Sequence, residues 1–103
     1  MSKYVIEEKW PDGENLKDQL VFDHGDFESE ECVKNWGYEK APVEIKNEGI
    51  SWSFNAVTTS PRDGRIEWRG TVKGEKIKGS ASWTRLDGLK MSVHFVGREL
   101  REQ

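Results

Sequence analysis

Only one cysteine occurs among the 103 residues of this chain, which excludes an internal disulfide. A reduced, cytoplasmic setting is the default for such a sequence. The residues after Met1 are polar and run directly into a strand pattern, so we expect no signal peptide. No stretch approaches the roughly 18–20 consecutive apolar residues of a membrane-spanning helix, so we expect no membrane partner.

The motifs of common enzyme and metal sites are also missing. The sequence has no Gly-rich phosphate loop, no G-x-S-x-G element and no H-E-x-x-H zinc motif. The two histidines, His24 and His94, are far apart and lack the spacing of metal ligands. The acidic cluster at 23–31 lacks the residue order of a calcium loop. We therefore expect no metal, no cofactor and no enzymatic activity.

Cys32 is the one candidate nucleophile, in the first turn of an expected short helix where a thiolate is favoured. Against this, Glu30 and Glu31 oppose ionisation, and no histidine lies nearby in sequence. A small packed residue is the more economical interpretation.

Charge is unevenly distributed along the chain. Residues 1–48 have a net charge of −7 and residues 49–103 a net charge of +4, within an overall −3. Such asymmetry is typical of a partner surface or of nucleic-acid binding, but opposite walls of one small domain also attract each other in this way. We favour the second interpretation, and treat residues 1–103 as a single domain.

Residues 50–96 show the strongest pattern, four strands in succession with apolar and polar residues alternating at period two. The turns predict the pairing: Gly74-Glu75 sets Lys73 opposite Lys76. By the same logic a three-residue loop sets Arg85 opposite Leu89, and a five-residue loop sets Thr59 opposite Arg65. In these registers the inner face forms four rows, namely Ala56–Trp68–Ala81–Val93, Phe54–Gly70–Gly79–Phe95, Thr58–Ile66–Trp83–Met91 and Trp52–Val72–Ile77.

Upstream of residue 50 the chain supplies further walls of the same sheet. We expect strands at 3–9, with Tyr4 and either Ile6 or Val5 inward, and at 17–23. Pro42 opens a short strand whose Val43 and Ile45 point inward, and the tail after Val96 is expected to fray.

Capping residues at both ends predict a short helix at about 30–36. Ser29 can cap its start, and Gly37 suits its left-handed stop. We expect Val33 and Trp36 to pack on the body as a plug over one end. The prediction is an all-β antiparallel up-and-down meander of about seven strands, closed as a lipocalin-like barrel. An open half-barrel or a two-sheet sandwich is the alternative.

Two elements of the sequence carry a resemblance to a known family. The first comprises Phe27, Ser29, Cys32, Gly37 and Tyr38, and the second is T-x-S-P-x-x-G-x-I-x-W-x-G-T-V-x-G over Thr58–Gly74. Together they resemble a family of small bacterial proteins of unknown function, which is similar to lipocalin-type and avidin-type (calycin) barrels. The resemblance covers most of residues 20–84 and implies the fold, with no activity or ligand. Some family members look exported, whereas we expect no such leader in this chain.

The outer face is expected to be a solvated surface. Its basic strip comprises Arg65, Arg69, Lys73, Lys76, Lys78 and Arg85. A nucleic-acid platform would need aromatic rings on the same face, and the tryptophans fall on the opposite one, so we expect no nucleic-acid partner.

The interior offers two interpretations of function. In the first, the barrel holds a small apolar or aromatic ligand. Its predicted ligand-binding residues are Trp52, Phe54, Trp68, Gly70, Gly79, Trp83 and Phe95. In the second, the phenyl rings fold over the two glycines, the interior is filled, and the domain works through its surface with a protein partner.

Overall fold

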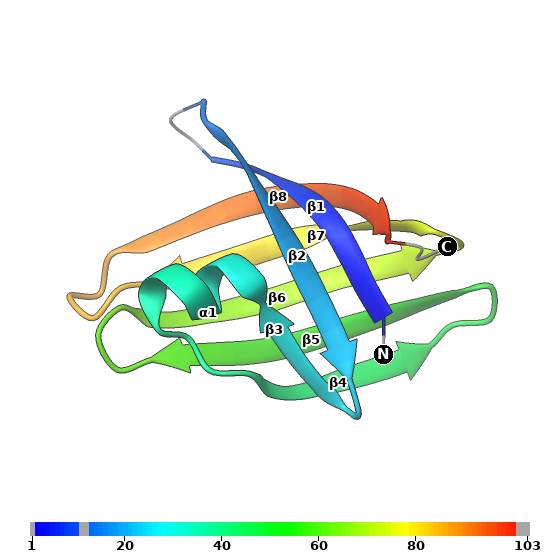
Figure 1. The fold of residues 1–103 in the computed structure, drawn as a ribbon, viewed down its shortest axis with the longest axis horizontal. Coiled ribbons are helices and arrows are strands. Elements are labelled where there is room, and N and C mark those ends of the chain that lie inside the picture. The colour runs from blue at the N-terminus through cyan, green and yellow to red at the C-terminus, as the bar shows by residue number, and fades with distance from the viewer. Residues whose placement is uncertain (1, 11–12, 101–103) are drawn as a thin grey trace.

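Eight strands and one helix are formed by residues 2–10 and 13–100, which the computed structural model describes (Figure 1). The helix α1 spans Glu30–Trp36. The strands are β1 (Ser2–Lys9), β2 (Asn15–Asp23), β3 (Asp26–Ser29), β4 (Ala41–Asn47), β5 (Ser51–Ser60), β6 (Gly64–Lys73), β7 (Lys76–Thr84) and β8 (Lys90–Glu99). Within this part of the chain no helix is long and apolar enough to cross a membrane.

Each strand pairs antiparallel with the next, and β8 pairs with β1, so the sheet closes into a barrel. The predicted all-β meander is confirmed. The additional strand is β3, which has only four residues and is not among the predicted strands. The expected fraying after Val96 is wrong for the next three residues, because Gly97 pairs with Ile6 and Glu99 with Tyr4. Residues 101–103 of the expected tail lie outside the described residues.

The predicted registers of the four long strands are confirmed. Lys73 lies opposite Lys76, and Thr59 lies opposite Arg65. The Arg85 amide donates to the Leu89 carbonyl at 2.8 Å. All four inner rows occur as predicted, because a slip of one residue would have turned every apolar side chain toward solvent.

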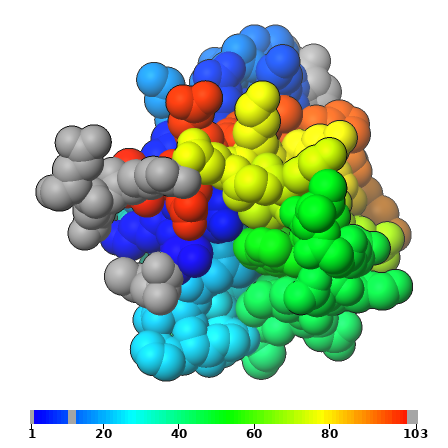
Figure 2. Space-filling view, turned by 90° about the vertical axis from the view of Figure 1, so that its right-hand side faces the viewer, coloured from blue at the N-terminus to red at the C-terminus, as the bar shows by residue number. Residues whose placement is uncertain are grey.

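The two ends of the barrel differ. The end that we call the helix end carries α1, the β1–β2 hairpin, the β5–β6 turn and the β7–β8 loop. Pro11 and Asp12 of the expected β1–β2 turn are outside the described residues, but the Gly13 amide donates to the Trp10 carbonyl at 3.0 Å. Figure 2 views the opposite end, where the β4–β5 and β6–β7 turns lie around the start of β1.

The helix has the predicted caps. The Ser29 hydroxyl accepts a hydrogen bond from the Cys32 amide at 3.2 Å, and Gly37 adopts φ +74° at the C-terminus. The expected packing of Val33 and Trp36 is wrong, since they are 38% and 48% exposed. Cys32 is the helix residue that packs against the core instead.

Ile45 lies in an inner row as predicted, but it is not buried, because its side chain is 56% exposed. It shares a row with the buried Phe54. However, β3 pairs with β4 only at Asp26–Pro42 and Phe27–Ala41, so the second half of β4 has no strand covering it on that side. Val43, nearer the paired half, packs against the core as expected.

Candidate functional site

The barrel interior near the two central glycines is filled by aromatic rings. A Cβ atom built on Gly70 would lie 2.6 Å from Cε1 of Phe54, and one on Gly79 would lie 2.7 Å from Cζ of Phe95. The phenyl rings therefore occupy the space that the glycines leave, as the second interpretation of the interior predicts for this region. Trp52 lies farther toward the opposite end, with its ring 5.4 Å from that of Phe22 between centroids.

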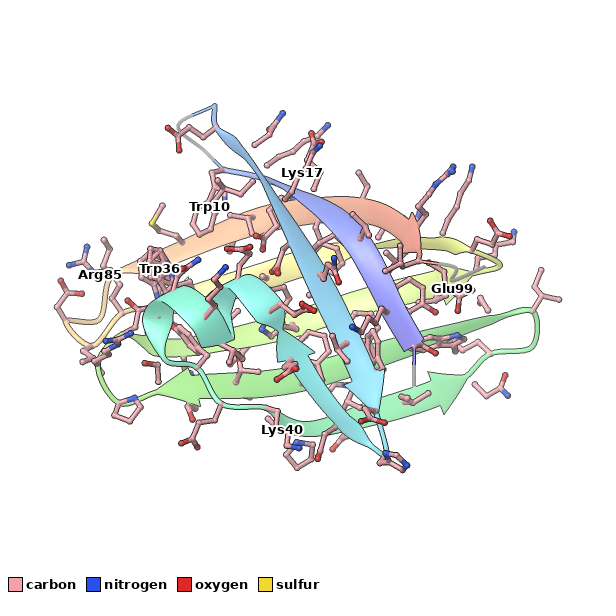
Figure 3. All side chains as sticks on the ribbon, viewed as in Figure 1. Trp10, Lys17, Trp36, Lys40, Arg85 and Glu99 are labelled. Atoms are coloured by element: carbon pink, nitrogen blue, oxygen red, sulfur yellow. The ribbon has the colours of Figure 1, made fainter. Side chains whose placement is uncertain are left out.

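A cavity of about 650 Å³ lies at the helix end, which we call the helix-end cavity. Its inner lining comes from β6, β7 and β8 and comprises Ile66, Trp68, Ala81, Trp83, Met91 and Val93. Its remaining lining comes from the β1–β2 hairpin, α1 and the β5–β6 turn and comprises Glu8, Trp10, Glu14, Leu16, Lys17, Glu31, Cys32, Asn35, Trp36 and Asp63. Figure 3 shows Trp10 and Trp36 on this side of the barrel, in front of β7 and β8. Of the seven predicted ligand-binding residues, the structure brings Trp68 and Trp83 to this cavity.

Three tryptophans form the aromatic wall of the helix-end cavity. The rings of Trp10 and Trp83 meet edge to face, with centroids 6.2 Å apart. The Trp68 indole donates to the Thr58 hydroxyl at 3.1 Å, and the Trp83 indole donates to the Asp63 carbonyl at 3.4 Å. These bonds fix two of the rings. The Nε1 atom of Trp10 is buried and has no hydrogen-bond acceptor among the described residues.

The helix is held over this end by the β5–β6 turn. The Ser60 hydroxyl donates to the Trp36 carbonyl at 2.7 Å, and the Arg62 guanidinium donates to the Trp36 and Asn35 carbonyls at 3.3 Å each. These donors satisfy carbonyls at the negative end of the helix. The Tyr38 hydroxyl donates to Oδ2 of Asp63 at 2.7 Å, and burial raises the pKa of Tyr38. The C-terminal end of α1 is therefore held in place by residues of the β5–β6 connection.

Two carboxyl groups lie on the inner face, on β1 and β2, and neither was among the predicted site residues. Glu8 is 6% exposed and Asp18 is buried too. Burial, together with the neighbouring charges of Asp18 and Glu31, raises the pKa of Glu8 to about 8. At neutral pH and with no partner, Glu8 is therefore mostly protonated.

The two carboxyl groups have different surroundings. Oδ1 of Asp18 accepts from the Gln19 amide at 2.7 Å and from the Glu31 amide at 3.0 Å, and Oδ2 accepts from the Ser29 hydroxyl. Burial raises the pKa of Asp18, and these hydrogen bonds oppose that rise. Asp18 thus supports the start of α1, whereas the described residues give the Glu8 carboxyl no hydrogen bond or ion pair.

Cys32 faces the helix-end cavity as a protonated thiol. Burial raises its pKa to about 12, and the negative charges of Asp18, Glu8 and Asp63 add to that rise. A thiol in this state is a poor nucleophile. Among residues 2–10 and 13–100, no three His, Cys, Asp or Glu side chains are grouped so that they could hold a metal ion.

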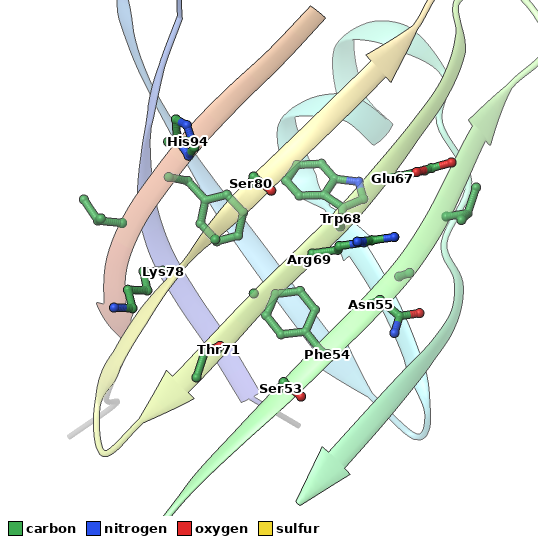
Figure 4. Close-up of a pocket in the computed structure, with 16 residues that line it drawn as sticks. Ser53, Phe54, Asn55, Glu67, Trp68, Arg69, Thr71, Lys78, Ser80 and His94 are labelled. Carbon is green, nitrogen blue, oxygen red and sulfur yellow. The ribbon is translucent and has the colours of Figure 1, made fainter. Parts of the chain in front are cut away.

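A second hollow lies on the outer surface of β5–β8 and has a volume of about 880 Å³ (Figure 4). Its polar lining comes from the outer rows, where Asn55, Arg69, Ser80 and His94 follow one another across four strands. This depression is larger but is open to solvent, so a small ligand there would lose little water-exposed apolar surface. The helix-end cavity is the better candidate for that reason.

A signal for the missed acids was present in the sequence. Tyr4, Ile6, Glu8 and Trp10 follow one another at period two, so Glu8 belongs to the apolar face of β1. Asp18 stands in the same relation to Leu20 and Phe22 on β2. Period-two alternation thus places both acids on the inner face, although acids generally prefer water.

Comparison of the chain with models of protein families, with curated proteins and with solved structures gave no match. The resemblance to a bacterial family therefore stays a prediction. The functional argument depends on the geometry of the barrel alone.

Proposed function

We propose that this protein binds a small aromatic or apolar compound in the helix-end cavity and does not transform it. The observation that supports this proposal is the cavity itself, about 650 Å³ within a closed barrel and walled by Trp10, Trp68 and Trp83. Small-molecule sites in proteins are typically 300–1,000 Å³ and largely apolar, with few polar groups. A cytoplasmic location remains a prediction from the single cysteine.

The energetics of packing support the same proposal. An unfilled apolar cavity sacrifices dispersion contacts that a larger side chain would supply. Ala81 lines the cavity beside Trp68, where a small side chain leaves the space open. Beside the two central glycines, by contrast, phenyl rings fill the space.

A surface role with a protein partner is the second candidate. The exposed side chains of Val57 and Val96 border the outer depression, beside Arg69 and Lys78. Apolar groups next to charged ones are typical of the rim and core of a weak interface. The depression is open to solvent, so we rank this function below ligand binding.

The test is a screen of small aromatic compounds by two-dimensional NMR. We expect chemical-shift changes at the indole N–H signals of Trp10 and Trp83 and at the Ala81 amide, with the Gly70 and Gly79 amides unaffected. A true ligand also raises the melting temperature by mass action. Shifts confined to outer-face residues would support the surface role instead.

A matched pair of variants locates the binding site. Ala81→Phe places a ring in the helix-end cavity, whereas Ser82→Phe places the same ring on the exposed outer face of the same strand. We expect the first variant to abolish ligand binding and the second to retain it. Binding that survives Ala81→Phe in a folded protein would contradict the proposed site.

A further inference from the structure

We infer that the helix-end cavity takes an organic cation, a compound whose protonated amine pairs with the Glu8 carboxylate while its apolar body lies against the indoles. This inference rests on the proposed function and names the chemical class of its ligand.

Glu8 differs from the other buried polar or charged residues, because its side chain makes no hydrogen bond among the described residues. The described part of the chain buries five polar or charged side chains, namely Glu8, Asp18, Ser29, Thr58 and Ser60. The last four each make at least one hydrogen bond to another group of the protein. Glu8 makes none among the described residues, although only 6% of it is exposed and it lines the cavity. The carboxyl oxygens of Glu8 are not among the described polar atoms that are both fully enclosed and without a partner, so they remain accessible from the cavity, where a ligand can pair with them.

The immediate neighbours of Glu8 explain why the protein itself supplies no partner. Across the ladders, Glu8 lies opposite Leu16 on β2 and opposite Phe95 on β8. Both are apolar, so the carboxyl projects from a hydrophobic wall into the cavity. A ligand amine in the cavity is the group that can reach it.

The charge of the lining favours a cation over an anion. Four acidic side chains line the cavity, namely Glu8, Glu14, Glu31 and Asp63, against one basic side chain, Lys17. Indole faces also attract organic cations, and desolvation strengthens that attraction. Trp10, Trp36, Trp68 and Trp83 all line the same space. A bare metal ion fits less well, because no three acidic, histidine or cysteine side chains of the described residues are grouped so that they could hold one.

Titratable groups from three elements surround Glu8. From β2 and its hairpin come Asp18, Glu14 and Lys17, from α1 come Glu31 and Cys32, and from the β5–β6 turn comes Asp63. On the side of β8, Val93 and Phe95 face inward and neither titrates. Burial and the charges of Asp18 and Glu31 oppose ionisation of Glu8, so a cation must displace the proton of Glu8 in order to bind.

Because the cation displaces a proton from Glu8, its affinity should depend on pH. Below about pH 8 the fraction of ionised Glu8 falls tenfold for each pH unit. The apparent affinity for a cation should fall by the same factor. A neutral ligand that accepts a hydrogen bond from protonated Glu8 would show the opposite trend, since its affinity would fall as pH rises through 8.

The experiment compares two probes of similar size, tryptamine, which is a cation below pH 9, and its neutral alcohol analogue, indole-3-ethanol. Binding to the full chain is measured by NMR titration between pH 6 and pH 9. At pH 8.5 we expect tryptamine to bind at least tenfold more tightly than the alcohol. We also expect its affinity to rise about tenfold per unit from pH 6 to pH 8.

Two variants distinguish the effect of Glu8 from the effect of removing any other acidic side chain. Glu8→Gln keeps the shape of the protonated residue and should fold, which its NMR spectrum checks. It should remove the preference for tryptamine and the pH dependence. Glu7→Gln changes the neighbouring acid, whose side chain points to the other face of β1, and should leave both unchanged.

The outcomes distinguish failure of the cation inference from failure of the proposed function. Equal, pH-independent binding of both probes, with shifts at Trp10 and Trp83, would overturn the cation inference and leave the proposed function standing. An affinity that falls as pH rises would also overturn the inference, in favour of a neutral ligand. If neither probe nor any compound of the earlier screen shifts the cavity signals, both fail.

Discussion

The ring of Phe54 lies directly over Gly70 across the β5–β6 ladder. Phe54 is almost fully buried, and a Cβ atom on Gly70 would come within 2.6 Å of its ring. Gly79 lies beside Gly70 on β7 and has even less room, because its Cβ would lie 2.0 Å from the Arg69 carbonyl oxygen and 2.7 Å from the Phe95 ring. The two glycines therefore determine both the bend of the wall and the seating of two phenyl rings.

The first prediction follows from that crowding. Gly79→Ala should destabilise the protein by about 3 kcal/mol or more, the upper range for overpacking a core, because backbone must move as well as a ring. Equilibrium denaturation with urea measures the change. The control is Lys78→Ala, the preceding residue on the same strand with an exposed side chain, for which we expect a change within about 0.5 kcal/mol. A fully stable Gly79→Ala protein would show that the close contact is not real.

The second prediction concerns Glu8 and pH. Its pKa in the folded state, about 8, lies above the ordinary value of 4.5, so the fold favours the protonated form. The contribution of Glu8 to stability is therefore fully present below pH 4.5 and is lost as pH rises to 8, at up to about 1.4 kcal/mol per pH unit. Glu8→Gln removes this loss. The free energy of unfolding of the variant should equal that of the parent protein at pH 4. At pH 9 it should be larger by a few kcal/mol.

Urea denaturation of both proteins at pH 4, 6, 8 and 9 checks this expectation. Asp18 contributes a slope of the same sign, since burial raises its pKa too. The difference between parent and variant is therefore the quantity that isolates Glu8. A difference that does not change with pH would mean that Glu8 is solvated or paired in solution.

The third prediction concerns the start of α1. The hydroxyl of Ser29 accepts from the Cys32 amide and donates to Asp18. Ser29→Ala removes a helix cap and leaves a buried carboxylate oxygen without its donor, so we expect a loss of about 2–3 kcal/mol. Ser92→Ala is the control, because it removes an exposed hydroxyl contact to Ser82 and should cost about 0.5 kcal/mol or less. Equal losses in the two variants would contradict the buried network.

The fold could be predicted from the sequence because two independent features of the sequence indicated the same strand pairing. Turn lengths and period-two alternation each predicted the same registers for β5–β8, and a slip in either would have exposed Trp68. The short strand β3 had no such support, since only four residues and two paired positions with β4 define it. Its alternation is too brief to separate from a turn.

The site was less predictable because it depends on how α1 lies over the barrel end. The prediction used hydrophobicity and assigned Val33 and Trp36 to the buried side, whereas hydrogen bonds from the β5–β6 turn orient the helix so that Cys32 packs inward. These contacts join residues about 25 positions apart, and no local pattern encodes them. The cavity is the space that this orientation leaves open.

The last prediction uses Cys32 as a reporter of that orientation. With a pKa of about 12, the thiol should be ionised about one part in 10⁴ at pH 8, whereas an unfolded cysteine with pKa near 8.5 is substantially ionised there. Alkylation of the native protein should therefore be about a thousandfold slower or more than alkylation in urea, and its rate should keep rising tenfold per pH unit through pH 10. A Cys32→Ser protein that carries Ser82→Cys on the exposed outer face is the matched control, and its rate should level off near pH 8.5. A native Cys32 rate that levels off near pH 8.5 would place the thiol in water, and would mean that α1 does not cover the helix-end cavity.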